Sequence, residues 1–345
     1  MIVGVDRVLP EQLLGKIVKY EIANEKGLVL VPANSVLSRE SLRLLQQHQI
    51  DSSDIVVISP PDELESTPSS ALVQEAKRYS KDLFDRIKMN RKVPLLEIKN
   101  ELIPIVQQAS KHPDLFELFE SVKAKDEYTH QHNIGVGVLS TLIGNWLDLD
   151  ETEIALLSLA GTMHDVGKVR IPEEILLKPG KLTKEEFDEM KRHTVYGYDL
   201  LKGTVGLSPR VAVVALQHHE RMDGSGYPLR LKGPQIDFMS QIVAVADVFH
   251  AMSSKRPYHD ALPFFEVANR MREGFFGDLN PHIVAVFLDN FVRSLIGRRV
   301  RLTDGRWGEV IYLNPHDDLH PLVKVGQSFL DLSKDRQIQI QEIIV

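Results

Sequence analysis

The residues of this chain that could carry out chemistry are histidines and aspartates spread over its middle part. His164 and Asp165 are adjacent, His218 and His219 form a second pair, and Asp247 follows within an apolar run. An adjacent imidazole and carboxylate can both reach a metal from one edge of a helix, and a carboxylate can bridge two ions. One such pair is weak evidence, because His-Asp also occurs as a surface or capping feature. The combined set predicts a metal centre suited to hydrolysing phosphate esters.

We expect these groups to be buried. His164, Asp165 and Lys168 follow a nearly all-apolar stretch that predicts a helix, and Asp247 has apolar neighbours on both sides. Burying such groups without partners costs roughly several kcal/mol, and a metal ion is one good partner. His193 is expected on a helix that begins near residue 183. Taken alone, it is more simply explained as a core histidine bonded to a carbonyl.

Helix geometry sorts the remaining histidines. His218 and His219 lie about 100° apart around a helix, so both can face one site only at a helix end. The sequence 220–226 is typical of a helix ending there. His130 and His132 are separated by roughly 200°, so at most one of them faces the site. His132 lies on the apolar stripe of its helix and is the better candidate.

Composition limits the ligands and the class of protein. The chain has 345 residues, 43% of them hydrophobic, no cysteine and a net charge of −7. Without thiolates, only His, Asp and Glu remain as ligands, which suits Mn, Fe, Mg or Zn. The negative charge argues against a binder of nucleic-acid polymers. There is no apolar run long enough to span a membrane, and residues 1–14 do not form a secretory signal, so we expect a cytoplasmic protein.

Four segments are expected along the chain. Residues 1–60 predict a small α+β module, and residues 61–119 predict a linker followed by connecting helices. Residues 120–295 form a dense series of predicted helices that carry the candidate ligands. Residues 296–345 predict a small all-β module, in which an Asp-Gly turn at 304–305 joins two strands. The predicted fold is therefore mainly α, with a small module at each end.

The sequence 126–259 resembles the HD-GYP domain, a subgroup of the HD phosphohydrolases associated with hydrolysis of the bacterial second messenger cyclic di-GMP. The resemblance rests on ordered motifs: Asp126-Glu127-Tyr128-Thr129 with His132, His164-Asp165-Val166-Gly167-Lys168, Ile171-Pro172, Lys178-Pro179-Gly180, Met190-Lys191-Arg192-His193, Gln217-His218-His219-Glu220-Arg221, Asp223-Gly224-Ser225-Gly226-Tyr227-Pro228, Ala246-Asp247-Val248 and Arg256-Pro257-Tyr258. It implies an HD-type helical bundle.

The resemblance also implies two divalent metal ions, with Fe or Mn expected first and Zn, Ni, Co or Mg as alternatives. One ion would be held by four residues, His132, His164, Asp165 and Asp247. The other would be held by three, His193, His218 and His219, with Asp165 bridging the two. Substrate binding is implied for six residues: Lys168, Arg221, Gly226, Tyr227, Pro228 and Arg256. Of these, the Gly-Tyr-Pro loop would contact the guanine end, Arg256 a phosphate, and Lys168 the leaving group.

Three positions depart from the family's pattern. Tyr128 stands where some members have a Glu that supports a third metal, so two metals are expected here. His250 replaces a frequent Asp. His259 stands where Arg or Lys is common, which bears on phosphate affinity.

The expected reaction is hydrolysis of cyclic di-GMP to pGpG, GMP or both, by a hydroxide that bridges the two metals. A second hypothesis is a silent sensor of cyclic di-GMP, or a module that docks GGDEF-domain proteins through the Gly-Tyr-Pro loop. A third is a phosphohydrolase acting on another cyclic dinucleotide or on a nucleotide monophosphate. Dimerisation through the helices of residues 71–119 is the expected oligomeric contact.

Overall fold

The chain forms two compact units, Met1–Ser66 and Thr67–Val345, in a computed structural model. The structure describes residues 69–123, 128–254, 262–275 and 277–344, and from the first unit 13–14, 16–18, 20–24, 28–32, 35, 37–48, 50–52, 55 and 57–58. The predicted phosphate ligand Arg256, its neighbour His259 and most of the first 14 residues lie outside these ranges. Among the described residues, no helix combines the length and apolarity that crossing a membrane requires.

The N-terminal unit combines short strands with one helix. Strand β1 (Ile17–Val18) pairs antiparallel with β4 (Val57–Ile58), and β2 (Ile22–Ala23) pairs antiparallel with β3 (Val29–Val31). Helix α1 (Arg39–Gln47) begins after Ser38, whose side chain accepts the N–H of Ser41 and so caps the helix. These elements confirm the predicted α+β module, whose core contains Val18, Ile22, Val31, Leu37, Leu45 and Ile55.

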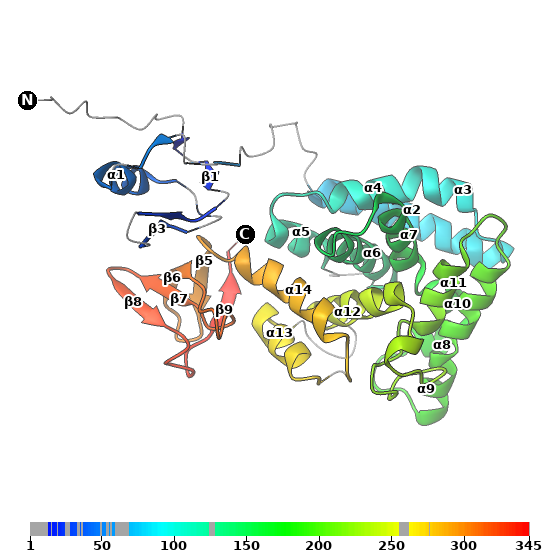
Figure 1. The fold of residues 1–345 in the computed structure, drawn as a ribbon. Helices are drawn as coiled ribbons and strands as arrows, with labels where there is room; N and C mark the ends of the chain where they lie inside the picture. Colours follow the sequence, from blue (N-terminus) through cyan, green and yellow to red (C-terminus); the bar gives the residue numbers. More distant parts are fainter. Residues whose placement is uncertain are drawn as a thin grey trace, which may run out of the picture. The chain divides into compact units, whose positions relative to one another are not determined.

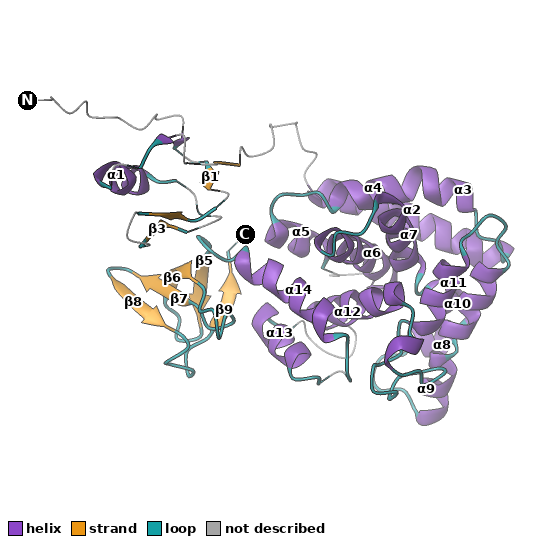
Figure 2. Ribbon diagram, in the orientation of Figure 1, coloured by secondary structure: helices purple, strands orange, loops and turns teal. Residues whose placement is uncertain are grey.

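The larger unit is mainly helical, as predicted (Figures 1 and 2). Its helices are α2 (Ser69–Asn90), α3 (Leu95–Glu97), the π-helical turn η3 (Ile98–Leu102), α4 (Ile103–Ala109), α5 (Leu115–Val122), α6 (Tyr128–Trp146), α7 (Glu151–Met163), the 3₁₀ turn η4 (Val166–Arg170), α8 (Glu173–Leu176), α9 (Lys184–Lys191), α10 (His193–Lys202), α11 (Pro209–Gln217), the 3₁₀ turn η5 (Gly233–Gln235), α12 (Phe238–Ser253), α13 (Phe264–Arg272) and α14 (Pro281–Arg293).

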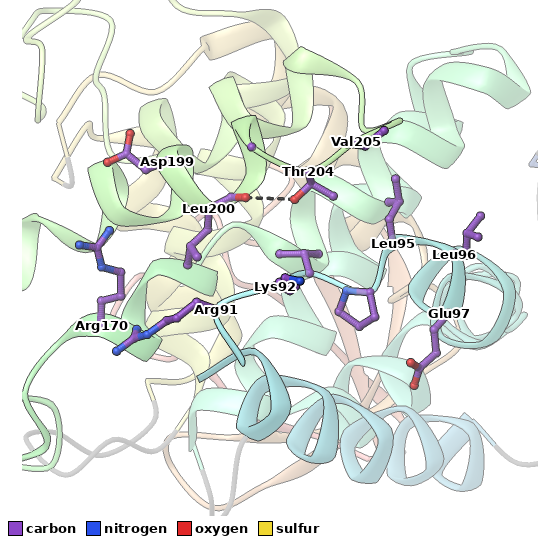
Figure 3. A pocket seen from close by; sticks show the side chains of 13 residues that line it. Arg91, Lys92, Leu95, Leu96, Glu97, Arg170, Asp199, Leu200, Thr204 and Val205 are labelled. Carbon is purple, nitrogen blue, oxygen red and sulfur yellow. Dashed lines mark hydrogen bonds between the residues drawn. The ribbon is translucent and has the colours of Figure 1, made fainter. Parts of the chain in front are cut away.

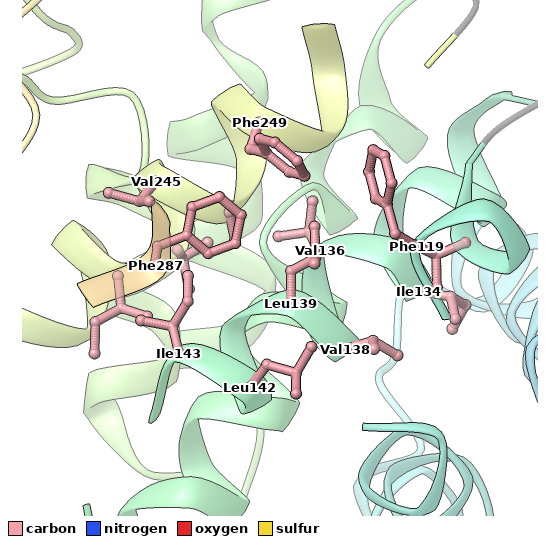
Figure 4. Close-up of a cluster of buried hydrophobic side chains, with 14 of the residues drawn as sticks. Phe119, Ile134, Val136, Val138, Leu139, Leu142, Ile143, Val245, Phe249 and Phe287 are labelled. Carbon is pink, nitrogen blue, oxygen red and sulfur yellow. The ribbon is translucent and has the colours of Figure 1, made fainter. Parts of the chain in front are cut away.

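Helix α6 runs through the middle of this unit and packs against α7 and α12. Apolar side chains on several faces of α6 are buried, which is typical of a helix surrounded by protein. Val136, Leu139 and Ile143 from α6 lie in one apolar cluster with Phe249 from α12 and Phe287 from α14 (Figure 4). Because this close-packed core holds α6, α7 and α12 in place, it also positions the polar side chains that those helices carry.

The C-terminal strands form one antiparallel sheet in the order β8-β7-β6-β5-β9. They are β5 (Arg299–Leu302), β6 (Trp307–Tyr312), β7 (Leu322–Val325), β8 (Ser328–Asp331) and β9 (Ile340–Ile343). The predicted hairpin is confirmed, since β5 pairs with β6 and Gly305 adopts a φ of 87° in the turn between them. Val300 and Val310 of this sheet share one buried cluster with the helices, and the segment boundaries near residues 120 and 296 stay predictions.

One predicted helix was wrong. The sequence placed His193 on the helix capped by Thr183, but α9 ends at Lys191 and α10 begins at His193. The His193 ring bonds to the carbonyl of Met190 over 2.7 Å, and the Thr194 hydroxyl donates to the carbonyl of Lys191. These side chains satisfy the last carbonyls of α9, so the chain can change direction here without leaving them unpaired.

Candidate metal centre

The seven predicted ligands gather at one place although they come from five helices. His132 lies on α6, His164 and Asp165 follow α7, His193 begins α10, His218 and His219 follow α11, and Asp247 lies on α12. The side chains of six of them are almost completely buried, and that of His219 is 20% exposed. The helix ends at residues 163 and 217 explain how adjacent residues in the chain can both face the cluster.

The two oxygens of Asp165 divide the histidines into two groups. Oδ2 lies 3.3 Å from Nε2 of His164 and 3.7 Å from Nε2 of His132. Oδ1 lies 3.3 Å from Nε2 of His193 and 3.8 Å from Nε2 of His218. A carboxylate placed between two sets of nitrogen ligands can bridge two metal ions.

Asp247 also lies between the two groups. Its Oδ1 is 3.0 Å from Nε2 of His132, and its Oδ2 is 3.8 Å from Nδ1 of His219. Two sets of ligand atoms each fall within 4.8 Å of one another, one on His132, His164 and Asp165 and the other on Asp165, His193, His218 and His219. The structure therefore brings together all seven candidates, with one carboxylate between the groups and a second reaching both.

Hydrogen bonds to the backbone determine which nitrogen of three histidines faces the cluster. Nδ1 of His164 lies 2.7 Å from the carbonyl of Gly161, and Nδ1 of His218 lies 3.0 Å from that of Ala215. His193 makes the equivalent bond to Met190. Because a carbonyl only accepts, each Nδ1 must carry the hydrogen, and each neutral ring presents the Nε2 lone pair to the cluster.

This arrangement fits a divalent cation. Nε2 of His164 and Oδ1 of Asp165 are buried and make no hydrogen bond. Nε2 of His193 and Nε2 of His218 lie 3.2 Å apart, although the backbone bonds leave a lone pair on both. Facing lone pairs repel unless a positive charge lies between them, and unpaired buried acceptors are costly. Imidazole and carboxylate donors in this number suit Fe, Mn or Zn.

The surroundings of the site favour an ionised carboxylate at Asp165 and neutral rings at most of the histidines. Burial alone would raise the pKa of Asp165, but the charge of Lys168, whose Nζ lies 2.5 Å from Oδ2, and the nearby imidazoles hold that pKa well below its usual range. Burial lowers the pKa of His193 to about 4. His164 differs, because Asp165 outweighs burial and raises its pKa. Ionised carboxylates beside mostly neutral imidazoles are the protonation states that metal binding requires.

The Gly-Tyr-Pro loop lies directly against the second group of histidines. The Tyr227 ring stacks on the His219 imidazole, with centroids 4.7 Å apart and planes at 28°. Burial, together with the negative charges of Asp247 and Asp165, raises the pKa of Tyr227, so its phenol stays protonated. Tyr227 also donates its backbone N–H to the carbonyl of His219 over 3.2 Å. The loop thereby covers one face of a candidate ligand.

Glu220 binds the backbone of this loop; it lies within one of the sequence motifs, but no role was predicted for it. Its side chain is buried and accepts the backbone N–H groups of Leu229 (2.6 Å), Arg230 (3.1 Å) and Leu231 (2.9 Å). Gly226 is needed because the loop passes very close to the chain at residues 219–221. Its position in the sequence, directly after two candidate ligands, could have indicated this role. If a Glu is buried there, its negative charge needs several hydrogen-bond donors.

The remaining predicted residues have varied surroundings. Arg221 donates to the carbonyl of Glu220 over 2.8 Å, and its aliphatic part packs against Gly277. His130 packs edge-on against Phe84, with ring centroids 5.7 Å apart, and is in neither ligand group found among the described residues. Pro228 follows a cis peptide bond.

A cleft of about 740 Å³ lies elsewhere on the same unit, between the α2–α3 connection and α10 (Figure 3). Arg91, Lys92, Arg170 and Asp199 are among its lining residues, and none of the seven candidate ligands is. The guanidinium of Arg170 stacks on the Tyr196 ring at 4.2 Å. Because none of the candidate ligands lines this cleft, we do not assign the metal centre to it, although it is large.

A buried cluster of His and Asp on packed helices defines a helical metal-binding domain. The HD domain family profile matches residues 98–274, and the chain belongs to the HD domain family. In fold, it is similar to a solved Bdellovibrio bacteriovorus structure described as an HDG"Y"P protein, with a TM-score of 0.54, 15% identity, and coverage of 83% of this chain and 98% of that one. That likeness confirms the HD-type fold.

Three named relatives share sequence with this chain. A Pseudomonas aeruginosa protein named cyclic di-GMP phosphodiesterase PA4108 is 33% identical over 74% of this chain and 62% of its own length. A Thermotoga maritima cyclic di-GMP phosphodiesterase is 44% identical over 50% of this chain and 49% of its own. A Vibrio cholerae 3'3'-cGAMP-specific phosphodiesterase 1 is 41% identical over 49% and 39%. The chain thus spans less than two thirds of each of these relatives.

Proposed function

We propose that this protein is a metal-dependent phosphodiesterase that hydrolyses cyclic di-GMP to pGpG, GMP or both. The observation that carries the proposal is the position of Asp165, whose two oxygens face two separate groups of buried histidines. The names of the Pseudomonas and Thermotoga relatives support the choice of substrate. A degenerate sensor would be expected to lack some ligands, whereas all seven candidates are present here.

Each group of ligands would hold one ion. His132, His164, Asp165 and Asp247 would hold the first, and His193, His218 and His219 the second, with Asp165 shared between them. Fe(II) or Mn(II) suits this thiolate-free set, and Zn, Ni, Co or Mg are alternatives. Bound ions would neutralise phosphate charge and lower the pKa of water to near neutrality.

Lys168 has the position expected of a residue that assists the leaving group. Its side chain is 16% exposed, and its ammonium pairs with Asp165 at the border of the first group. Hydrolysis joins a water oxygen to phosphorus, breaks the bond from phosphorus to the 3′ oxygen, and transfers a proton to that oxygen. A lysine ammonium beside the phosphate would stabilise the negative charge that develops on the leaving oxygen.

The Gly226-Tyr227-Pro228 loop would bind the base end of the substrate. Tyr227 lies on His219, the most exposed of the candidate ligands, so the loop borders the side on which a substrate can approach. Arg221 follows the same histidines and would add positive charge next to the phosphates. Arg256 remains the proposed ligand of the other phosphate.

A second substrate has a specific observation in its favour, because a 3'3'-cGAMP-specific phosphodiesterase is 41% identical to this chain. Cyclic di-GMP and 3′3′-cGAMP share the phosphodiester ring and differ in one base.

We also propose a cytoplasmic location, docking of GGDEF-domain proteins through the loop, and a homodimer through residues 71–119. Much of the apolar face of α2 packs against its own chain, so a dimer contact through this helix would have to use its remaining surface.

The test is hydrolysis by protein loaded anaerobically with Fe(II) or Mn(II), given cyclic di-GMP and 3′3′-cGAMP in parallel. A variant with His164→Ala and Asp165→Ala is compared with His282→Ala, which changes an exposed histidine. Metal-dependent product from the parent and from His282→Ala, but not from the double variant, is expected. Tight nucleotide binding without product would identify a sensor, and faster turnover of 3′3′-cGAMP would change the substrate.

A further inference from the structure

His250 lies behind the first group of ligands, and the proposed function gives it no part. It is completely buried on α12, three residues after Asp247. Its Nδ1 lies 3.0 Å from Nδ1 of His132, and its Nε2 lies 2.9 Å from the carbonyl oxygen of Val122. One imidazole therefore connects the end of α5, the start of α6 and α12.

The carbonyl of Val122 determines where the hydrogens are. A carbonyl oxygen only accepts, so Nε2 of His250 must donate to it, and Nδ1 of the neutral ring is then an acceptor. His132 consequently donates its Nδ1–H to His250. The remaining nitrogen of His132, Nε2, keeps its lone pair on the side of Asp165 and Asp247, which lie 3.7 and 3.0 Å from it.

His132 differs in this respect from three other histidines of the centre. Backbone carbonyls accept the Nδ1–H of His164, His193 and His218. For His132, the bond to Nδ1 comes from the side chain of His250. The orientation of this one imidazole thus depends on a residue far away in the sequence.

Gly135 leaves the space that the His250 ring occupies. A Cβ on Gly135 would overlap the His250 ring. Its distances to Nε2 and Cδ2 would be far below 3.0 Å, a separation that Cβ atoms in proteins essentially never show. The ring cannot move away cheaply, because it is buried and bonded through both nitrogens. Gly135 and His250 therefore act as a pair.

We propose that His250 is a positioning residue for the metal centre: it accepts the Nδ1–H of His132, directs Nε2 of His132 at the first ion, and requires glycine at position 135. The inference rests on the two-metal site of the proposed function. His250 thereby gives His132 a neutral acceptor. A neutral acceptor orients the ligand without adding negative charge behind it.

The test measures metal binding rather than turnover. Mn(II) is titrated into metal-free protein against a chelator of known affinity, and metal per chain is counted after gel filtration. His250→Ala removes the acceptor, whereas His250→Asn keeps a neutral oxygen attached to Cγ, as Nδ1 is. We expect two ions per parent chain, a first site weakened about 10–100-fold in His250→Ala, and affinity within about threefold of the parent in His250→Asn.

Gly135→Ala supplies an independent perturbation of the same contact. It should weaken the first site as much as His250→Ala does, and the double variant should be no weaker than His250→Ala alone, because the clash needs the ring. Circular dichroism of the metal-free proteins checks that each variant folds. If Gly135→Ala does not fold, the comparison of His250→Ala with His250→Asn decides the inference by itself.

Several outcomes would overturn the inference. They are parent affinity in His250→Ala, equal losses in His250→Asn and His250→Ala, or additive losses in the double variant. A parent that binds two ions but hydrolyses no cyclic dinucleotide would refute the proposed activity and leave the role of His250 standing. A parent that binds no metal would refute both.

Discussion

Gly226→Ala gives the sharpest test of how the Gly-Tyr-Pro loop supports the metal centre. A Cβ at this position would lie 2.5 Å from the backbone nitrogen of Arg221 and 2.5 Å from Cα of Glu220, against 3.4 Å for an ordinary contact. Both are backbone atoms, so no side chain can turn away to make room. The loop would have to retreat by about 1 Å, as overpacked sites do at a cost of about 1–3 kcal/mol.

The retreat would also loosen the stacking of Tyr227 on His219 and the 3.2 Å bond from Tyr227 N–H to the carbonyl of His219. A loss of about 2 kcal/mol corresponds to a fall in melting temperature of roughly 3–4 °C for a unit of this size. We further expect weaker binding at the second metal site, because His219 loses the ring that restrains it.

The assay is thermal unfolding of metal-free protein, followed by titration with Mn(II). Gly203→Ala is the matched control, since a Cβ there would meet nothing closer than 3.6 Å and its φ is −77°. The control should keep or slightly raise the melting temperature. If Gly226→Ala melts within about 1 °C of the parent and binds both ions equally well, the loop does not support His219 as argued.

Three further predictions concern the same unit. Glu220→Ala should lower the free energy of unfolding by about 3 kcal/mol, since the backbone N–H groups of three loop residues lose one buried, charged acceptor. The exposed Glu174→Ala should change it by less than about 0.5 kcal/mol, and equal denaturation midpoints would contradict this. Metal-free protein should lose stability as the pH falls below about 6.5, by roughly 1 kcal/mol per pH unit for each histidine whose pKa is lowered, because unfolding frees that histidine to take up a proton. Burial lowers the pKa of His193 to about 4, that of His250 to about 3, and those of His218 and His219 well below their usual range, so all four contribute. A flat profile from pH 7 to 5 in denaturant titrations would refute this. His193→Ala should reduce bound metal from two ions to one per chain in elemental analysis, and retention of two would remove His193 from the ligand set.

Local sequence patterns were enough to predict most of the elements. A nearly all-apolar stretch predicted the helix α7, the sequence 220–226 predicted the end of the helix before His218, and the Asp-Gly turn predicted the pairing of β5 with β6. These succeed because a helix or hairpin is determined by residues a few positions apart. The same patterns missed the break between α9 and α10, where the His193 and Thr194 side chains replace the helical donors.

Residue types alone also limited the chemistry of the centre. A chain without cysteine, with buried His and Asp at helix ends, could be expected to bind metal through nitrogen and oxygen. Family resemblance extended this to seven named ligands. The types of the donors are therefore a property that the sequence by itself determined.

Only the tertiary structure decided how those donors face one another. Which oxygen of Asp165 meets which histidines depends on how five helices cross, and no local pattern contains that information. The bond between His132 and His250 joins residues 118 positions apart. The hydrogen bonds from loop N–H groups to Glu220 form only when the loop folds back over that side chain. Hydrogen-bond direction and close approach are set by packing, and for that reason they became visible only in the folded chain.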